Sequence, residues 1–279
     1  MVIAVASGKG GTGKTTIAAN LAWVAEKPVQ LLDCDVEEPN VHLFLNGPPE
    51  NETFVTLPIP QIDAERCNGC GECSRFCSFN AIAVVKGTPL IFPELCHACG
   101  GCARVCPQGA ISEKEERIGA VQERRVGGIH LVTGLLTVGL SLAPPVVRAV
   151  KARSDQDMPV VLDAPPGTGC PVVAALQGAD FALLVTEPTP FGLHDLRLAV
   201  ELVRKLEIPF AVVVNRVGIG DERVHRFCSD EGIPIFSEFP DDRRVAEAYS
   251  RGKLLVEALP HWRPLFVDLW KKIEAATRS

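Results

Sequence analysis

The sequence predicts an α/β fold with a mostly parallel sheet, into which a smaller cysteine-rich domain is inserted. Residues 2–6 form a short apolar run suited to a buried strand, and a glycine-rich loop and a helical segment follow it. After residue 126, apolar runs again alternate with helical segments, as expected when helices cover both faces of a parallel sheet. Between these two regions, eight cysteines fall in two evenly spaced groups. We therefore expect one discontinuous α/β domain and one insert.

The glycine-rich loop has the spacing of a phosphate-binding loop. Residues 8–15 read GKGGTGKT and match the pattern G-x-x-x-x-G-K-[ST]. Glycines let backbone N–H groups turn toward phosphates, and the following helix adds the positive end of its dipole. Lys14 is expected to reach the β- and γ-phosphates, and the Thr15 hydroxyl to bind Mg²⁺. The loop residues predicted to bind nucleotide are Gly8, Gly10, Gly11, Thr12, Gly13, Lys14, Thr15 and Thr16.

A second lysine, Lys9, follows the first glycine of this loop. With it, the loop resembles the deviant phosphate loop of the MinD/Mrp/ParA ATPases, in which such a signature lysine reaches the nucleotide of a dimer partner. The resemblance implies a MinD-like P-loop fold, ATP and ADP as ligands with Mg²⁺, and an ATP-dependent homodimer. It also implies slow, partner-stimulated ATP hydrolysis, with Lys9 and Lys14 neutralising charge on the transferred phosphoryl group.

Acidic residues after two predicted strands are candidates for the metal and for the attacking water. Asp163 ends the apolar strand at residues 159–163, where Walker-B acids support Mg²⁺ through water. By resemblance to the family, Asp35 is the first-switch aspartate that orients or activates the attacking water, and Asp33 is the weaker candidate. The alternative for each is an aspartate that caps the next helix.

The base of the nucleotide is expected to contact the second half of the chain. Asn215 closes the strand AVVVN, and the resemblance implies that its side chain hydrogen-bonds adenine. Pro240 and Asp241 match a loop that packs beside the base in relatives. A plain turn asparagine is the alternative for Asn215.

The cysteine groups form an internal repeat with the spacing of a bacterial two-cluster ferredoxin, in which the fourth cysteine of each group binds the other cluster. We therefore expect two [4Fe–4S] clusters in a small α+β ferredoxin-like domain. Zinc is the alternative, but it leaves the third cysteine of each group without a role. The predicted ligands are Cys67, Cys70, Cys73 and Cys106 for cluster 1, and Cys96, Cys99, Cys102 and Cys77 for cluster 2.

Three cysteines lie outside this repeat. Cys34 and Cys228 are interpreted as small buried hydrophobic residues. Cys170 is similarly placed to the cluster cysteine of the nitrogenase iron protein, but the second cysteine of that protein has no counterpart here. We therefore expect no cluster at Cys170.

These features divide the chain into an ATPase domain at residues 1–57 and 118–279 and an insert at residues 58–117. Residues 51–60 are rich in proline and are expected to be irregular. Residues 113–117 read EKEER and are expected to be a solvated linker. The final segment, residues 262–276, carries an apolar stripe that we expect to dock on the sheet rather than on a membrane.

The composition of the chain makes some classes of binding partner unexpected. A net charge of −6 and a single tyrosine make nucleic acid an unexpected partner. No secretory signal precedes the first strand, and the 11 cysteines suit metal rather than disulfides, so a cytoplasmic protein is expected and a membrane partner is not.

The sequence supports two functions of different classes. In the first, ATP drives a dimeric switch that couples nucleotide state to electron transfer, or to iron–sulfur or metallocluster handling with a partner protein. In the second, the chain is a MinD/ParA-type positioning or complex-assembly ATPase in which the clusters are structural. An ATP-dependent amidation, as in cobyrinate diamide synthases, is a weaker third interpretation because the chain is too short for a glutaminase domain.

Overall fold

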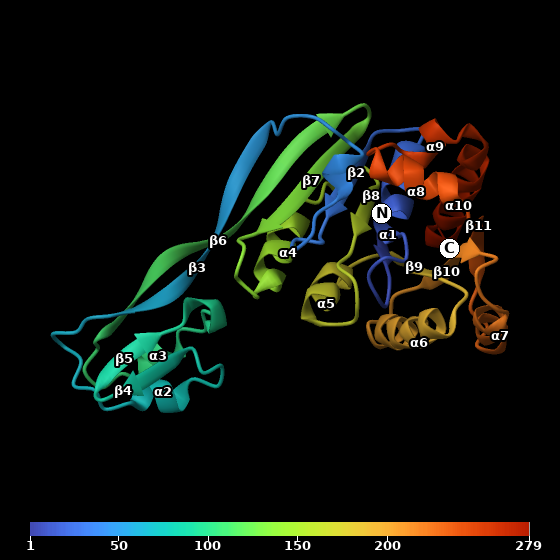
Figure 1. The fold of residues 1–279 in the computed structure, drawn as a ribbon. Coiled ribbons are helices and arrows are strands. Elements are labelled where there is room, and N and C mark those ends of the chain that lie inside the picture. Colours follow the sequence, from blue (N-terminus) through green and yellow to red (C-terminus); the bar gives the residue numbers. More distant parts are fainter. Residues whose placement is uncertain (279) are drawn as a thin grey trace.

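The computed structural model describes residues 1–278 of the 279-residue chain. Its main body is a nine-stranded sheet with helices on both faces, and a small lobe lies apart from it at the end of a long two-stranded ribbon (Figure 1). The predicted α/β class with a mostly parallel sheet is therefore confirmed.

Seven neighbouring strands of the sheet are parallel, and two antiparallel strands extend one edge. Apolar residues fill the central strands because both of their faces are covered. In spatial order the strands are β11 (Ile235–Pro240), β10 (Phe210–Val217), β9 (Phe181–Thr186), β1 (Val2–Ala6), β8 (Val160–Asp163), β2 (Val29–Asp33), β7 (Ile129–Leu136), β6 (Ile111–Val126) and β3 (Asn51–Ile62).

Alternation along each central strand divides the core between two helical layers. In β1, Ile3 and Val5 pack in one layer, while Ala4 and Ala6 pack in the other. The first layer contains α1 (Lys14–Trp23), η1 (Val41–Leu43), α8 (Arg243–Ser250), α9 (Leu255–Ala258), η3 (Pro260–Trp262) and α10 (Arg263–Thr277). The second contains α4 (Ala143–Lys151), α5 (Cys170–Leu176), α6 (Pro190–Lys205) and α7 (Arg223–Asp230).

The C-terminal helix α10 packs on the sheet, as its apolar stripe predicts. Phe266, Leu269 and Ile273 have no exposed surface, and the ring of Phe266 lies 4.8 Å from that of Phe239 on β11. Leu265 is exposed. Within residues 1–278, no helix has both the length and the hydropathy needed to cross a bilayer.

The expectation that residues 51–60 are irregular is wrong, because they belong to β3, which pairs with β6 along its whole length. Proline is tolerated in β3 because it is the edge strand, so Pro58 and Pro60 remove no N–H that a further neighbour would need. The solvated linker predicted at residues 113–117 is also wrong, because β6 runs through it.

That part of the ribbon is exposed on most of its surface. It therefore lacks the one-sided apolar alternation by which a strand is recognised in sequence. Both proposed domain boundaries, at residues 57 and 117, fall inside paired strands.

The lobe at the end of the ribbon holds the cysteine repeat. Among residues 1–278, the Ser141 hydroxyl on the main body donates a hydrogen bond to the Glu94 carbonyl of the lobe at 3.3 Å. Its elements are α2 (Glu72–Phe76), β4 (Ile82–Val85), β5 (Thr88–Ile91), η2 (Pro93–Leu95) and α3 (Gly101–Val105).

Removing the Phe266 side chain should test how far α10 stabilises the fold. Phe266→Ala leaves a cavity between α10 and β11, so we expect a loss of about 3–5 kcal/mol in the free energy of unfolding. Urea denaturation followed by circular dichroism measures the change. Leu265→Ala, on the exposed side of the same helix, is the control and should cost less than about 1 kcal/mol. Equal losses in the two variants would contradict the packing.

Candidate functional site

The phosphate loop joins β1 to α1 and closes against β10. Gly11 and Gly13 have φ values of 79° and 90°, in the left-handed region that favours glycine. A Cβ on Gly13 would lie 2.4 Å from Nδ2 of Asn215. The same Nδ2 donates a hydrogen bond to the Thr12 carbonyl at 2.8 Å. The structure therefore places Asn215 directly on the loop, 203 residues along the chain from Thr12.

Lys14 is the first residue of α1 and is almost completely buried. Its Nζ lies 2.8 Å from Oδ1 of Asp163, at the end of β8, and 3.8 Å from Oδ2 of Asp35. Burial acts to lower the pKa of Lys14, but the Asp163 and Asp35 carboxylates outweigh it and raise that pKa. Oδ2 of Asp163 is buried and has no hydrogen-bond partner in the described structure. That oxygen is free to accept a hydrogen bond from a water bound to a metal ion.

Two aspartates after β2 differ in their surroundings. Asp33 is fully buried and accepts hydrogen bonds from the backbone N–H groups of Val41 and Asp35. Asp35, in contrast, lines a cavity beside the phosphate loop. Burial raises the pKa of Asp35 to about 6, with Lys14 opposing the rise and the charge of Asp163 adding to it. Asp35 is therefore the better placed of the two to meet a ligand.

A cavity of about 570 Å³ opens beside the phosphate loop. The predicted residues that line it are Gly10, Gly11, Gly13, Lys14, Thr15, Thr16, Asp35, Asn215, Pro240 and Asp241. Gly8, Lys9, Thr12 and Asp163 are not among its lining residues.

Sequence reasoning missed several side chains of this cavity. Arg216 directly follows Asn215, and Glu38 lies in the segment after Asp35. Tyr249 and Trp262 come from α8 and η3. Arg216 adjoins a predicted residue and could have been suspected from its position. Tyr249 and Trp262 carry no local signal, because only the folding of α8 and η3 over the loop brings them there.

Lys9 does not line this cavity and pairs instead with the carboxylate of Glu187. Its Nζ lies 3.4 Å from Oε2 of Glu187, and its side chain is 33% exposed. Nη1 of Arg216 lies 2.6 Å from the other oxygen of Glu187.

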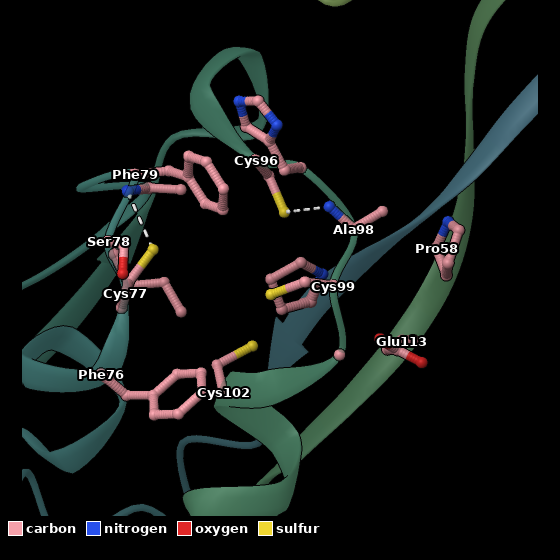
Figure 2. Close-up of a pocket in the computed structure, with 15 residues that line it drawn as sticks. Pro58, Phe76, Cys77, Ser78, Phe79, Cys96, Ala98, Cys99, Cys102 and Glu113 are labelled. Atoms are coloured by element: carbon pink, nitrogen blue, oxygen red, sulfur yellow. Dashed lines mark hydrogen bonds between the residues drawn. The ribbon is translucent and has the colours of Figure 1, made fainter. Parts of the chain in front are cut away.

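The four cysteines assigned to cluster 2 line one cavity in the lobe. Figure 2 shows the sulfur atoms of Cys77, Cys96, Cys99 and Cys102 around a common space. The backbone N–H of Ala81 donates to Sγ of Cys77 at 3.3 Å, and that of Ala98 donates to Sγ of Cys96 at 3.4 Å. The walls include Pro58, Pro60, Phe76, Phe79, Ile82 and Glu113.

The four cysteines assigned to cluster 1 line a second cavity: Cys67, Cys70, Cys73 and Cys106. The backbone N–H of Ala110 donates to Sγ of Cys106 at 3.3 Å, which repeats the contact between Ala81 and Cys77. The two halves of the lobe are thus alike in structure as well as in sequence.

Each cavity contains at least one partly buried thiol with other thiols close to it. Burial raises the pKa of Cys73, and its neighbours Cys67 and Cys106 add to the effect. Burial likewise raises the pKa of Cys96, with Cys77 and Cys99 adding to it. Among the described residues, no group of three or more His, Cys, Asp or Glu side chains is placed so that it could hold a single metal ion.

The other cysteines are separate from these cavities. Cys34 and Cys228 are buried, as predicted. Cys170 is exposed at the first position of α5.

Comparison with known proteins identifies the body of the chain. A family model for the CobQ/CobB/MinD/ParA nucleotide binding domain matches residues 3–256. An uncharacterized protein of Methanocaldococcus jannaschii is 34% identical over 262 residues, which cover 91% of this chain and 90% of that protein. An iron-sulfur cluster carrier protein of Pyrococcus abyssi is 26% identical, over 90% of this chain and 77% of the carrier.

Solved structures share the fold at lower identity. The cell division ATPase MinD of Pyrococcus furiosus superposes with a TM-score of 0.60 at 20% identity, covering 99% of this chain and 98% of MinD. The septum site-determining protein MinD of Pyrococcus horikoshii, complexed with Mg-ADP, gives 0.58 at 18% identity and covers 98% and 95% of the two chains.

The raised pKa of Asp35 predicts a pH-dependent cost to stability. An aspartate whose pKa is higher in the folded chain stabilises the fold at low pH, and this contribution is lost as the pH rises from about 4 to about 6. Asp35→Asn removes this charge. Without nucleotide, the free energy of unfolding of the variant should therefore be about 1–3 kcal/mol higher than that of wild type at pH 7.5. The difference should shrink toward pH 4. Denaturation curves across this range test it, with Asp241→Asn as an exposed control on the same cavity; a pH-independent difference would contradict it.

Proposed function

We propose that this chain, which belongs to the CobQ/CobB/MinD/ParA nucleotide-binding domain family, is an ATPase whose nucleotide state is coupled to two iron–sulfur clusters. The observation that carries the proposal is the buried contact of Lys14 with Asp163 and Asp35, beside a cavity that Lys14, Asp35 and the phosphate loop line. A lysine held between carboxylates at a loop of backbone N–H groups suits a triphosphate with its metal ion.

In this proposal hydrolysis depends on positioning and charge neutralisation. Lys14 leaves Asp163 to contact the β- and γ-phosphates, while loop N–H groups bind the phosphate oxygens. Thr15 and Asp163 would hold Mg²⁺, whose chemistry is to neutralise the phosphates. The free oxygen of Asp163 supports an indirect contact through water. Asp35 orients the attacking water.

The rest of the cavity accounts for the nucleoside. Asn215 touches the loop backbone, and Pro240 and Asp241 line the same cavity. We assign Asn215 to adenine recognition and the loop at residues 240–241 to the side of the base. Tyr249 adds an aromatic surface to this part of the site.

We further propose an ATP-dependent homodimer in which Lys9 contacts the nucleotide bound to the partner subunit. Lys9 is partly exposed and does not line the cavity of its own subunit, which supports a role outside it. The length of this side chain and the glycines on either side of it suit such a contact.

The lobe fits two [4Fe–4S] clusters, one in each cavity. Four thiols surround each space, and backbone N–H groups donate to three of the sulfur atoms, as expected of cysteines that hold a cluster. Cys67, Cys70, Cys73 and Cys106 would hold the first cluster, and Cys77, Cys96, Cys99 and Cys102 the second. The clusters would supply one-electron chemistry or serve as cargo for a partner protein. The iron-sulfur cluster carriers among the relatives support this direction.

Replacing Lys14 should test whether the phosphate loop is the site of ATP hydrolysis. Lys14→Ala removes the charge that meets the phosphates, so we expect kcat for ATP hydrolysis to fall by about 100-fold or more. Lys27→Ala, which removes an exposed lysine paired with Glu274, is the control and should behave like wild type. Phosphate release measures hydrolysis, and a fluorescent ATP analogue measures nucleotide binding. Unchanged hydrolysis in Lys14→Ala would exclude this site.

Iron analysis of anaerobically purified protein should establish the clusters. Wild type should contain about eight iron atoms and about eight acid-labile sulfides per chain, as two [4Fe–4S] clusters require. Cys106→Ser and Cys77→Ser should each lose about half, from different clusters, whereas Cys228→Ser should lose none. Iron-free wild-type protein with full activity would overturn the cluster proposal.

The same preparations decide whether the clusters are coupled to ATP or are only structural. Coupling predicts that EPR spectra of the reduced protein differ between ADP and an ATP analogue. Identical spectra, with equal ATPase rates in oxidised and reduced protein, would favour a positioning or assembly ATPase.

A further inference from the structure

A buried carboxylate beside the nucleotide cavity has no part in the proposed reaction. Glu187 follows β9 and is only 6% exposed. One carboxylate oxygen pairs with Arg216 at 2.6 Å, and the other pairs with Lys9 at 3.4 Å. A buried carboxylate is costly unless it is paired, so these two cations compensate its charge. Glu187 thus joins the phosphate loop to the residue that follows Asn215.

The backbone that carries Glu187 is held firmly in place. A Cβ on Gly192 would lie 2.2 Å from the Glu187 carbonyl oxygen, and one on Gly220 would lie 1.5 Å from that of Pro188. The N–H of Thr189 also donates to the Glu187 carbonyl at 2.8 Å. This turn is packed from two sides, so the backbone of Glu187 stays in place when a cation moves away.

Lys9, in contrast, is held more firmly by its backbone than by its side chain. The Ser7 hydroxyl donates to the Lys9 carbonyl at 2.7 Å. The side chain is one-third exposed, and its contact with Glu187 is the longer of the two. The amine can therefore leave Glu187 without any change in the loop backbone.

We propose that Glu187 is a positioning residue that holds the Lys9 side chain within its own subunit until a nucleotide-bound second copy competes for it. This inference rests on the proposed dimer. Arg216 makes the release possible, because the closer cation stays on Glu187 when Lys9 leaves and the buried carboxylate keeps a partner. Lys9 then exchanges one carboxylate for the phosphates of the other subunit.

Two substitutions should shift this contact in opposite directions. Glu187→Gln removes the charge that attracts Lys9 but keeps an oxygen that can accept a hydrogen bond from Arg216. Arg216→Gln removes the competing cation, so Glu187 should hold Lys9 more tightly. Glu201→Gln, which removes an exposed carboxylate paired with Lys205, is the matched control.

The accessibility of the Lys9 amine tests the contact without nucleotide or dimer. The full chain is treated with an amine-reactive ester in the absence of nucleotide, and modification of Lys9 is followed by peptide mass spectrometry. We expect the modification rate of Lys9 to rise about threefold or more in Glu187→Gln, where the contact with residue 187 is weaker. The rate should fall in Arg216→Gln, where that contact is stronger. The rate in Glu201→Gln should equal that of wild type.

Sedimentation of the full chain with a saturating, non-hydrolysable ATP analogue tests the consequence. The dissociation constant of the dimer should fall about 3- to 10-fold in Glu187→Gln and rise in Arg216→Gln. The inference is overturned if wild type dimerises but Glu187→Gln matches Glu201→Gln in both measurements. A wild-type chain that binds the analogue and stays monomeric would instead overturn the proposed dimer, whatever the Lys9 modification rates are.

Discussion

The buried ion pair between Lys14 and Asp163 is the contact on which the rest of the site depends. Lys14 begins the helix that follows β1, and Asp163 ends β8, the strand that lies beside β1. Neither charge could be buried here alone, because an unpaired charge in the interior is strongly unfavourable. Their pairing therefore brings the first turn of α1, the phosphate loop and the end of β8 to one point of the sheet.

This point carries more negative than positive charge. Asp33, Asp35 and Asp163 surround the single amine of Lys14, and burial raises the pKa of both Asp33 and Asp35. Crowded carboxylates destabilise a fold by themselves but suit a site that takes a divalent cation together with a phosphate chain. Carboxyl groups whose pKa values are shifted by burial and by one another are enriched at functional sites.

The nucleotide site and the thiol cavities share one sheet. β2, which ends at Asp33, pairs with β7; β7 pairs with β6, and β6 pairs with β3. Pro58 on β3 and Glu113 on β6 then line the cavity of Cys77, Cys96, Cys99 and Cys102 (Figures 1 and 2). The lobe is thus not tethered by a flexible linker. It is carried on hydrogen-bonded strands that continue from the sheet of the body.

Local pattern was enough for the elements whose physics is local. Two buried strands, the phosphate loop and the cysteine spacing each have a short signature, because steric limits on the backbone and the geometry of the ligand act over a few residues. The sorting of eight cysteines into two quartets also came from spacing, and the structure brings each quartet around its own cavity. The exposed half of the β3/β6 ribbon was missed because strands without a buried face leave no apolar alternation.

The sequence by itself determined the class of fold, the phosphate loop and the two cysteine quartets. Only the tertiary structure decided that Asn215 touches Thr12, that Tyr249 and Trp262 wall the cavity, and that Glu187 holds both Lys9 and Arg216. These contacts join segments far apart in the chain, and their energies depend on burial and on mutual approach. Neither quantity exists until the strands have been ordered in the sheet.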